Sequence, residues 1–277
     1  MRPPHPGYAA AMISLTPLPG DGAGPPLPHA GWPRTLWLVR HGESEGNVAD
    51  RAAQASGLGV IDVPARDPDV ALSPLGERQA RALGTRLARL APDERPDAVL
   101  SSPYVRARRT AELAVAEAGL DLPVHLDERL RERDLGVLDG LTGQGIRERM
   151  PEEAQRRARL GKIYYRPPGG ESWLDVALRL RTVLEDVRRD YAGQRLLVAT
   201  HQAVIMVFRF VLEGLSEEQV LEIDGSVQIG NTAVTTYADA GNGRLELRGF
   251  NETDHLEDVG APVTQEPPAE QRAHAGA

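Results

Sequence analysis

The chain has 277 residues, of which 41% are hydrophobic and 26% are charged, and its formal net charge is −8. It contains no cysteine, which excludes disulfides, thiolate metal sites and every mechanism with a cysteine nucleophile, and no apolar run approaches the roughly 18 residues of a membrane span. The acidic balance argues against a general nucleic-acid binder, and these features together predict a cytoplasmic protein.

The two ends differ in composition from the middle of the chain. Residues 1–33 are rich in proline and glycine and show no hydrophobic period, so we expect a disordered leader. From residue 252 to residue 277 the composition returns to Pro, Glu, Gln, Ala and Gly, which predicts a second disordered tail. No repeat and no linker divides the segment between them, so residues 34–251 are expected to form one domain.

The first elements in chain order are a strand and a helix. Thr35–Val39 is a short apolar run that ends at the sequence RHG, a pattern typical of a buried strand that stops at a functional loop. Residues 48–70 are ambiguous and are predicted to form a loop or lid with little regular structure. Ser73 followed by Pro74 is a helix start, and apolar residues then recur at helical spacing up to Leu90.

The remaining elements alternate between strands and helices. A strand is predicted for Asp97–Ser102 and a helix for Tyr104–Ala118. Ser172 and Asp175 fit a capping box, and the apolar stripe behind them predicts a long helix. The last predicted elements are a strand at Arg195–Thr200, a helix at Ala203–Leu212, and a hairpin of Thr232–Ala238 with Arg244–Phe250 around a Gly-Asn-Gly turn.

Strands that alternate with helices indicate an α/β fold, in which a largely parallel sheet is covered by helices on both faces. In such sheets ligands bind beyond the carboxyl ends of the strands. Three short motifs stand at these ends, which are RHG (40–42), SSP (101–103) and ATH (199–201). Their coincidence predicts a composite active site.

His41 is the first candidate for chemistry at this site. It follows a strand, has Arg40 before it and Gly42 after it, and stands just before a predicted helix start. Transfer of a phosphoryl group to imidazole needs a neutral ring nitrogen aimed at phosphorus and positive groups on the phosphoryl oxygens. Arg40 can donate bidentate hydrogen bonds to those oxygens, and Asn47 can donate a neutral one.

Two further residues stand near neighbouring strand ends. Arg106 falls near the start of its helix, close enough to face the same crevice, although a solvated helix arginine is the simpler explanation. His201 follows an apolar strand and could stabilise the transferred group, or it could be a core histidine. A carboxylic acid beside a phosphate can remain protonated near neutrality and protonate the leaving oxygen. Glu132 is the best candidate, but spacing alone does not select it over Glu128 or Asp134.

The motifs as a set resemble the signature of the histidine phosphatase superfamily, which includes cofactor-dependent phosphoglycerate mutases and fructose-2,6-bisphosphatase. The stretches that carry the resemblance are LVRHGESEGN (38–47), LSPLGERQA (72–80), SSPYVRARRT (101–110), ERDLGVLDG (132–140), PPGGES (167–172) and ATH (199–201). The resemblance covers about residues 35–250. It implies a phosphoglycerate mutase-like α/β fold, a three-layer sandwich around a mixed, mostly parallel sheet.

The resemblance also implies the role of each site residue. His41 would be the phosphorylated nucleophile, and Arg40, Arg106 and His201 would form the phosphate pocket. Asn47 would lie near this pocket. Glu132 would donate the proton to the leaving group and later activate water. Neither a metal nor another cofactor is implied.

One departure from the family pattern bears on the reaction. After the second histidine the glycolytic mutases usually read Gly-Asn-Ser, whereas this chain has Gln202-Ala203-Val204, which is closer to the bisphosphatase branch. We therefore place Gln202 among the substrate-binding residues and expect hydrolysis of a phosphomonoester through a phosphohistidine on His41. This would make the protein a histidine acid-type phosphatase, with residues 48–70 and 141–168 shaping substrate choice.

Two alternatives stay open from the sequence. The first is a cofactor-dependent phosphoglycerate mutase, and the second is a non-catalytic protein that binds phosphorylated ligands. A P-loop kinase is excluded because the sole lysine, Lys162, is followed by isoleucine. The expected partner is a small phosphorylated metabolite rather than nucleic acid or a membrane, and a homodimer could form through an edge strand near the terminal hairpin.

Overall fold

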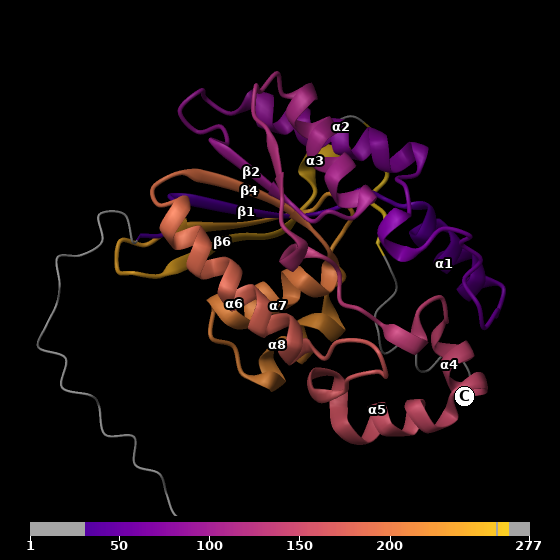
Figure 1. The fold of residues 1–277 in the computed structure, drawn as a ribbon. Coiled ribbons are helices and arrows are strands. Elements are labelled where there is room, and N and C mark those ends of the chain that lie inside the picture. The colour runs from indigo at the N-terminus through magenta and orange to yellow at the C-terminus, as the bar shows by residue number, and fades with distance from the viewer. Residues whose placement is uncertain (1–30, 259, 266–277) are drawn as a thin grey trace, which may run out of the picture.

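The computed structural model describes residues 31–258 and 260–265. Its centre is a sheet of six strands in the order β3-β2-β4-β1-β5-β6 (Figure 1). The strands are β1 (Thr35–Arg40), β2 (Ala98–Ser101), β3 (Val124–Leu126), β4 (Arg195–Thr200), β5 (Val234–Asp239) and β6 (Leu245–Glu252). The pairs from β3 to β1 are parallel, whereas β5 pairs antiparallel with both β1 and β6. The predicted mixed and mostly parallel sheet is therefore confirmed.

Helices cover both faces of this sheet (Figure 1). One layer holds α2 (Pro74–Arg89) and α3 (Val105–Glu117), and the other holds α6 (Trp173–Asp190), α7 (Gln202–Leu212) and α8 (Glu217–Ser226). The strand β4 shows why both faces are apolar, because successive strand residues point to opposite sides. Its residues Leu197 and Ala199 pack with α2 and α3, and Leu196 and Val198 pack with α6 and α7. The three-layer arrangement is as predicted.

The helix starts predicted from the sequence are present. Ser73 caps α2, since its hydroxyl accepts a hydrogen bond from the Gly76 amide at 3.0 Å. The capping box at α6 is reciprocal: the Ser172 hydroxyl accepts from the Asp175 amide at 3.2 Å, and the Asp175 carboxylate accepts from the Ser172 amide at 2.8 Å. Such contacts satisfy the amides that a first helical turn leaves without partners.

Three helices lie beyond the carboxyl ends of β1 and β4 (Figure 1), namely α1 (Glu45–Ala55), α4 (Gly143–Arg149) and α5 (Pro151–Tyr164). The prediction of little regular structure for residues 48–70 is wrong over the length of α1. This helix has only a short apolar face, so it gives a weak periodic signal. A capping box of Ser44 and Asn47 starts it, with 3.1 Å between each side chain and the other residue's amide.

The segment after α1 and the start of α4 form one continuous wall. The Thr142 hydroxyl donates to the Leu58 carbonyl at 2.8 Å, and the Thr142 amide donates to the Gly59 carbonyl at 3.2 Å. A Cβ at Gly145 would lie 1.8 Å from the Gly59 carbonyl oxygen, so only glycine permits this approach. The two segments expected to shape substrate choice are therefore joined to each other.

The predicted ends of the domain need correction. The domain begins before residue 34, because Trp32 packs against the core and its indole nitrogen donates to the Gly243 carbonyl at 2.7 Å. Beyond residue 252 the chain forms α9 (Asp254–Glu257), whose Leu256 is fully buried against Ala82 of α2. Few apolar residues achieve this docking, so average composition does not reveal it. The rest of the predicted leader and tail, residues 1–30 and 266–277, lies outside the described residues.

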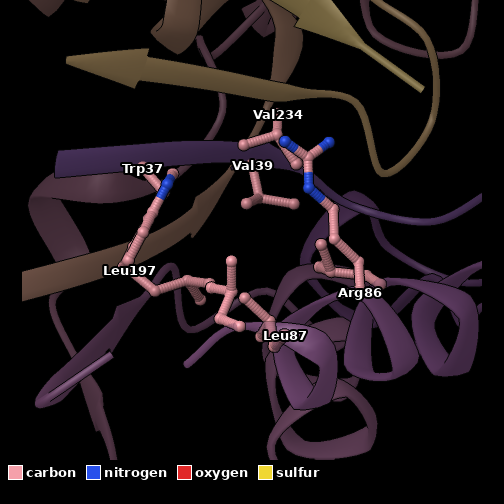
Figure 2. A pocket seen from close by; sticks show the side chains of 8 residues that line it. Trp37, Val39, Arg86, Leu87, Leu197 and Val234 are labelled. Atoms are coloured by element: carbon pink, nitrogen blue, oxygen red, sulfur yellow. The ribbon is translucent and has the colours of Figure 1, made fainter. Parts of the chain in front are cut away.

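A small cavity of about 40 Å³ lies between the sheet and α2. Figure 2 shows the side chains around it, with Val39 near the centre and Trp37, Leu87, Leu197 and Val234 around it. The lining is apolar apart from Arg86, and the space suits about one water molecule. This cavity is a feature of packing, and its lining includes neither His41 nor His201. No helix within the described ranges has the length and apolar character needed to cross a bilayer.

The fold buries a histidine, His255, whose protonation should change the free energy of unfolding. His255 on α9 is 3% exposed, and burial, followed by the charge of Arg86, lowers its pKa to about 4. Its Nε2 lies 3.1 Å from the Thr232 hydroxyl, which itself donates to the Asn231 carbonyl. Nε2 must therefore carry a proton, and Nδ1 has no hydrogen-bond partner among the described residues. A second proton on this ring would have no acceptor.

We expect His255 to make the protein less stable as the pH falls. An unfolded histidine titrates near 6.5, so the unfolded chain binds the proton first and stability is lost between about pH 6.5 and pH 4. Over this range the free energy of unfolding should fall by up to about 3 kcal/mol less in His255→Gln than in the wild type. Urea unfolding at pH 7.5, 6, 5 and 4.5 measures this. His125→Gln, on an exposed strand edge, is the matched control, and an unchanged pH dependence in His255→Gln would contradict the prediction.

Candidate active site

The three motifs predicted to converge meet at one edge of the sheet. β2, β4 and β1 are adjacent and parallel, with Ser101 opposite Ala199 and Arg40 opposite Thr200. The backbone continues this register beyond the strands. The His41 amide donates to the Thr200 carbonyl at 3.0 Å, and the Ser102 amide donates to the Ala199 carbonyl at 2.9 Å. Residues separated by up to 160 positions therefore share one crevice.

The two histidines of these motifs lie side by side. The ring centroids of His41 and His201 are 5.2 Å apart, and the planes meet at 62°. Both residues are buried. The Tyr104 ring packs edge-on against the other side of His201, also at 5.2 Å. This packing holds both imidazoles in one orientation.

The hydrogen bond of His41 determines which ring nitrogen can react. Nδ1 lies 2.7 Å from the Gly42 carbonyl oxygen. Since a carbonyl can only accept, Nδ1 must carry the proton. In the neutral ring the lone pair is then on Nε2, so Nε2 is the nitrogen available as a nucleophile.

His201 is held in the neutral form by its surroundings. Burial, followed by the charges of Arg106 and His41, lowers the pKa of His201 well below its usual value. Its Nε2 lies 2.8 Å from the Ser102 hydroxyl, and its Nδ1 is buried without a hydrogen-bond partner among the described residues. If the Ser102 hydroxyl donates to Nε2, Nδ1 carries a hydrogen that a phosphoryl oxygen could accept.

Two buried guanidinium groups complete the positive charge. Arg40 is 1% exposed, and its Nη1 donates to the Ile229 carbonyl at 2.5 Å. Arg106 lies over the Tyr104 ring at 5.0 Å, and its Nη1 donates to the Asp67 carbonyl at 2.6 Å. Backbone carbonyls fix the direction of both groups without removing their charge. A site of this kind suits a small anion with several oxygens, such as a phosphoryl group.

The loop after β1 is held in place through its backbone. The Gly42 amide donates to the Thr110 hydroxyl at 2.9 Å, and the Glu43 amide donates to the Gln79 side chain at 2.8 Å. A Cβ at Gly42 would lie 2.5 Å from the Gly76 carbonyl oxygen. Gly42 therefore permits the close approach of α2 to this loop.

Asn47 has a structural role in addition to the predicted one. Its Oδ1 accepts from the Ser44 amide in the capping box and from the Asn231 side chain at 3.3 Å. The side-chain nitrogen Nδ2 of Asn47 is consequently the group that could donate to a substrate oxygen. Asn47 is buried, and its Oδ1 and the His41 carbonyl accept from the same Asn231 side-chain nitrogen.

Asn231 is a site residue that sequence reasoning missed. Its side-chain nitrogen donates to the His41 carbonyl at 3.0 Å, and its Oδ1 accepts from the Thr264 hydroxyl at 2.9 Å. The next residue, Thr232, has a positive φ of 57° and donates its amide to the Arg40 carbonyl at 3.1 Å. The Gly-Asn pair before β5 indicates a turn, but nothing in the local sequence connects that turn to His41.

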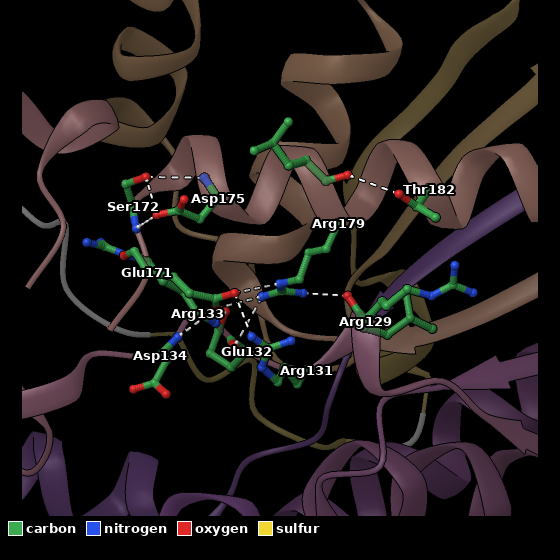
Figure 3. A network of polar contacts seen from close by, with 12 residues as sticks. Arg129, Arg131, Glu132, Arg133, Asp134, Glu171, Ser172, Asp175, Arg179 and Thr182 are labelled. Carbon is green, nitrogen blue, oxygen red and sulfur yellow. Dashed lines mark hydrogen bonds and ion pairs between the residues drawn. The ribbon is translucent and has the colours of Figure 1, made fainter. Parts of the chain in front are cut away.

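Glu132 lies on a loop that a network of arginines holds in place (Figure 3). Its own carboxylate accepts from the Arg133 amide at 2.8 Å. Arg179 of α6 donates to the Arg129 and Glu132 carbonyls, and the Glu171 carboxylate binds both Arg131 and Arg179. The loop is thus tied to α6 on both sides of Glu132.

Arg133 is a further arginine of this network. It donates to the Glu171 carbonyl at 2.6 Å and to the Tyr165 carbonyl at 3.1 Å, and burial lowers its pKa to about 10. The competing carboxylates differ in their surroundings: Glu128 is exposed, and Asp134 accepts from the Gly136 amide at 2.8 Å in a tight turn. Glu132 as the proton donor stays a prediction.

Gln202 and two tyrosines of residues 141–168 are further residues expected near the substrate. Gln202 and Tyr165 make hydrogen bonds to other protein groups. Gln202 donates to the Gln228 side chain at 2.7 Å, next to the Ile229 carbonyl that holds Arg40. Tyr165 is buried and donates to Glu153 at 2.7 Å, whereas Tyr164 is exposed. Within the described ranges, no group of three or more histidine or carboxylate side chains is arranged to hold a metal ion.

The six-stranded sheet covered by helices on both faces defines an α/β protein of the phosphoglycerate mutase-like fold class. Comparison with known proteins identifies the family. Residues 36–253 match the model of the histidine phosphatase superfamily (branch 1). The chain belongs to this superfamily.

Related proteins carry two different activities. A 2,3-bisphosphoglycerate-dependent phosphoglycerate mutase of Methylobacterium radiotolerans is 37% identical over 193 residues, which cover 69% of this chain and 84% of that protein. A mycobacterial glucosyl-3-phosphoglycerate phosphatase, solved with inorganic phosphate, superposes with a TM-score of 0.62 at 25% identity, over 80% of this chain and 99% of that one. A phosphoglycerate mutase from Bacillus anthracis shares the fold with a TM-score of 0.62 at 18% identity, over 83% of this chain and 97% of that one.

Because Asn231 supports the His41 carbonyl, we expect Asn231→Ala to lower turnover of p-nitrophenyl phosphate about tenfold. The loss should fall on kcat more than on KM, since the variant would displace His41, the predicted nucleophile, and leave Arg40 and Arg106 in place. Steady-state kinetics measure both. Asn242→Ala, in the exposed turn between β5 and β6, is the control that should behave as the wild type. A wild-type kcat in Asn231→Ala would show that this contact has no part in positioning.

Proposed function

We propose that this protein is a phosphatase that hydrolyses a phosphomonoester through a phosphohistidine on Nε2 of His41. The observation that carries the proposal is the orientation of that ring, whose Nδ1 proton is held by the Gly42 carbonyl at 2.7 Å. A neutral imidazole fixed in this tautomer, beside a second buried histidine and two buried arginines, has the features that nucleophilic attack on phosphorus needs.

In the first step Nε2 of His41 attacks phosphorus, and the bond between phosphorus and the leaving oxygen breaks. Arg40 and Arg106 donate hydrogen bonds to the phosphoryl oxygens, whose charge these buried guanidinium groups neutralise without a metal ion. The neutral His201 ring donates through Nδ1. The phosphohistidine keeps the phosphoryl group in this pocket while the leaving group departs.

Glu132 would serve both steps as acid and base. Protonated, it donates to the leaving alkoxide and becomes a carboxylate. It then removes a proton from the water that attacks the phosphohistidine, and this attack releases inorganic phosphate and restores His41. The arginine network around its loop supports this role, because a group that transfers two protons must return to the same position.

The partner in this reaction is a small phosphorylated metabolite, and we place the enzyme in the cytoplasm. The net charge of −8 argues against a binder of nucleic acid, and an acidic enzyme with an anionic substrate needs positive charge concentrated at its site. Gln202-Ala203-Val204 and the phosphatases among related structures support hydrolysis.

A phosphoglycerate mutase is the second candidate, because relatives up to 37% identical among those compared are named as such mutases. The two reactions give different products from one reagent. Incubation with 3-phosphoglycerate and a trace of 2,3-bisphosphoglycerate should release inorganic phosphate if the protein is a phosphatase. Formation of 2-phosphoglycerate without net phosphate release would identify a mutase.

We expect His41→Ala to reduce hydrolysis of p-nitrophenyl phosphate by at least about 1,000-fold, because it removes the nucleophile. It should also abolish the acid-labile phosphoenzyme that rapid quenching captures in the wild type. His125→Ala, at an exposed position, is the control. Equal activity in His41→Ala and wild type would leave a non-catalytic phosphate-binding protein as the better description.

Glu132→Gln tests the proton donor with leaving groups of different basicity. In kcat/KM, which reports formation of the phosphohistidine and not its hydrolysis, the variant should lose about 100-fold or more with an alkyl substrate such as glycerol phosphate. It should lose much less in kcat/KM with p-nitrophenyl phosphate, whose phenolate leaves without a proton. The rate ratio of the two substrates is the measurement. Glu128→Gln and Asp134→Asn are the matched controls, and whichever of the three variants changes this ratio identifies the acid.

A further inference from the structure

Arg106 has an anionic partner within the protein. Its Nη1 lies 3.0 Å from a carboxylate oxygen of Asp67, in addition to the 2.6 Å contact with the Asp67 carbonyl. Asp67 begins a short 3₁₀ turn, Asp67–Asp69, in the segment between α1 and α2. One edge of a guanidinium that is expected to bind phosphate is therefore covered by a carboxylate.

The two partners of this ion pair differ in their freedom to move. The Arg106 side chain is 7% exposed and is held over the Tyr104 ring, whereas the Asp67 side chain is 39% exposed. The carboxylate can turn into water with little loss, but the guanidinium cannot follow it. A ligand that competes for Arg106 would thus displace the Asp67 carboxylate and leave the arginine in place.

The charge of Asp67 also acts on two neighbouring groups, Tyr104 and Asp139. Burial, and then the charge of Asp67, raises the pKa of Tyr104 to about 12. Burial and Asp67 also raise the pKa of Asp139. Asp134 acts in the same direction on both groups, and Arg106 acts against it. A dianionic phosphoryl group in the same crevice would meet this negative charge as repulsion.

We propose that Asp67 is a charge gate on the phosphate site: its carboxylate pairs with Arg106, yields to the substrate phosphoryl group when this binds, and returns as inorganic phosphate leaves. This inference rests on the proposed phosphatase function. The gate weakens binding of the product, which carries the same charge as the transferred group. It thereby limits inhibition by inorganic phosphate, a product that every substrate of the enzyme releases.

A purely structural role for Asp67 predicts the opposite result. If the carboxylate served to aim Arg106, its removal would weaken phosphate binding. The Asp67 carbonyl, which is the shorter contact, already holds the same Nη1 and is kept in any variant. The sign of the change in phosphate affinity therefore separates a gate from a support.

The test is the affinity of inorganic phosphate for Asp67→Asn, which keeps the shape and removes the charge. Calorimetry should give about tenfold tighter binding than wild type, the size expected when one partly exposed like charge is removed beside a dianion. The inhibition constant of phosphate against p-nitrophenyl phosphate should fall by the same factor. Asp69→Asn is the matched control, because Asp69 lies on the same turn and pairs with Arg66 instead. It should leave both constants unchanged.

Each outcome has one meaning. If the wild type is active and Asp67→Asn binds phosphate equally or more weakly, the proposed gate is overturned. The proposed phosphatase function then still stands. Equal tightening in Asp69→Asn would overturn the gate too, because net charge alone would then explain the effect. Asp67→Ser repeats the test if Asp67→Asn folds poorly. A wild type that neither binds phosphate nor hydrolyses p-nitrophenyl phosphate would instead refute the proposed function.

Discussion

The parallel pairing of β2, β4 and β1 is the constraint on which the site depends. Parallel strands end at the same edge of a sheet, so three loops from distant parts of the chain begin within one crevice. The backbone contacts of His41 with Thr200 and of Ser102 with Ala199 extend this alignment beyond the strands. With the backbone fixed to this degree, the two imidazoles can be buried in contact with each other, and Nδ1 of His41 and Nε2 of His201 acquire defined partners.

Burial of two guanidinium groups at this edge of the sheet costs desolvation free energy. Nearby carbonyl and carboxylate groups offset that cost. Arg40 and Arg106 donate to backbone carbonyls, which orient each guanidinium while leaving its charge available. His201 stays neutral, which avoids adding another charge to a crowded pocket. Asp67 supplies a negative charge at the open side. An acidic protein can in this way present a cationic pocket to a phosphoryl group.

The segments around the pocket connect catalysis with substrate choice. The loop of Glu132 is tied to α6 through Arg179 and Glu171, so the proposed acid stands on a rigid support. Opposite it, the chain after α1 is joined to α4 through Thr142, and the same stretch carries Asp67 further along. Thr142 joins these walls, whereas the Gly42 carbonyl holds the His41 ring, so we expect changes in the walls to alter substrate choice without moving His41.

The sequence by itself was sufficient for the α/β class, the strands β1, β2 and β4, the capped helices α2 and α6, and the motifs at the strand ends. These features depend on local patterns of apolar and capping residues, which neighbouring positions record. The helix α1, the three-residue strand β3 and the docking of Leu256 were not predictable, because packing against distant residues stabilises them. Asn231 under His41 and Asp67 against Arg106 required the tertiary structure for the same reason: each contact joins residues whose spacing along the chain carries no periodic signal.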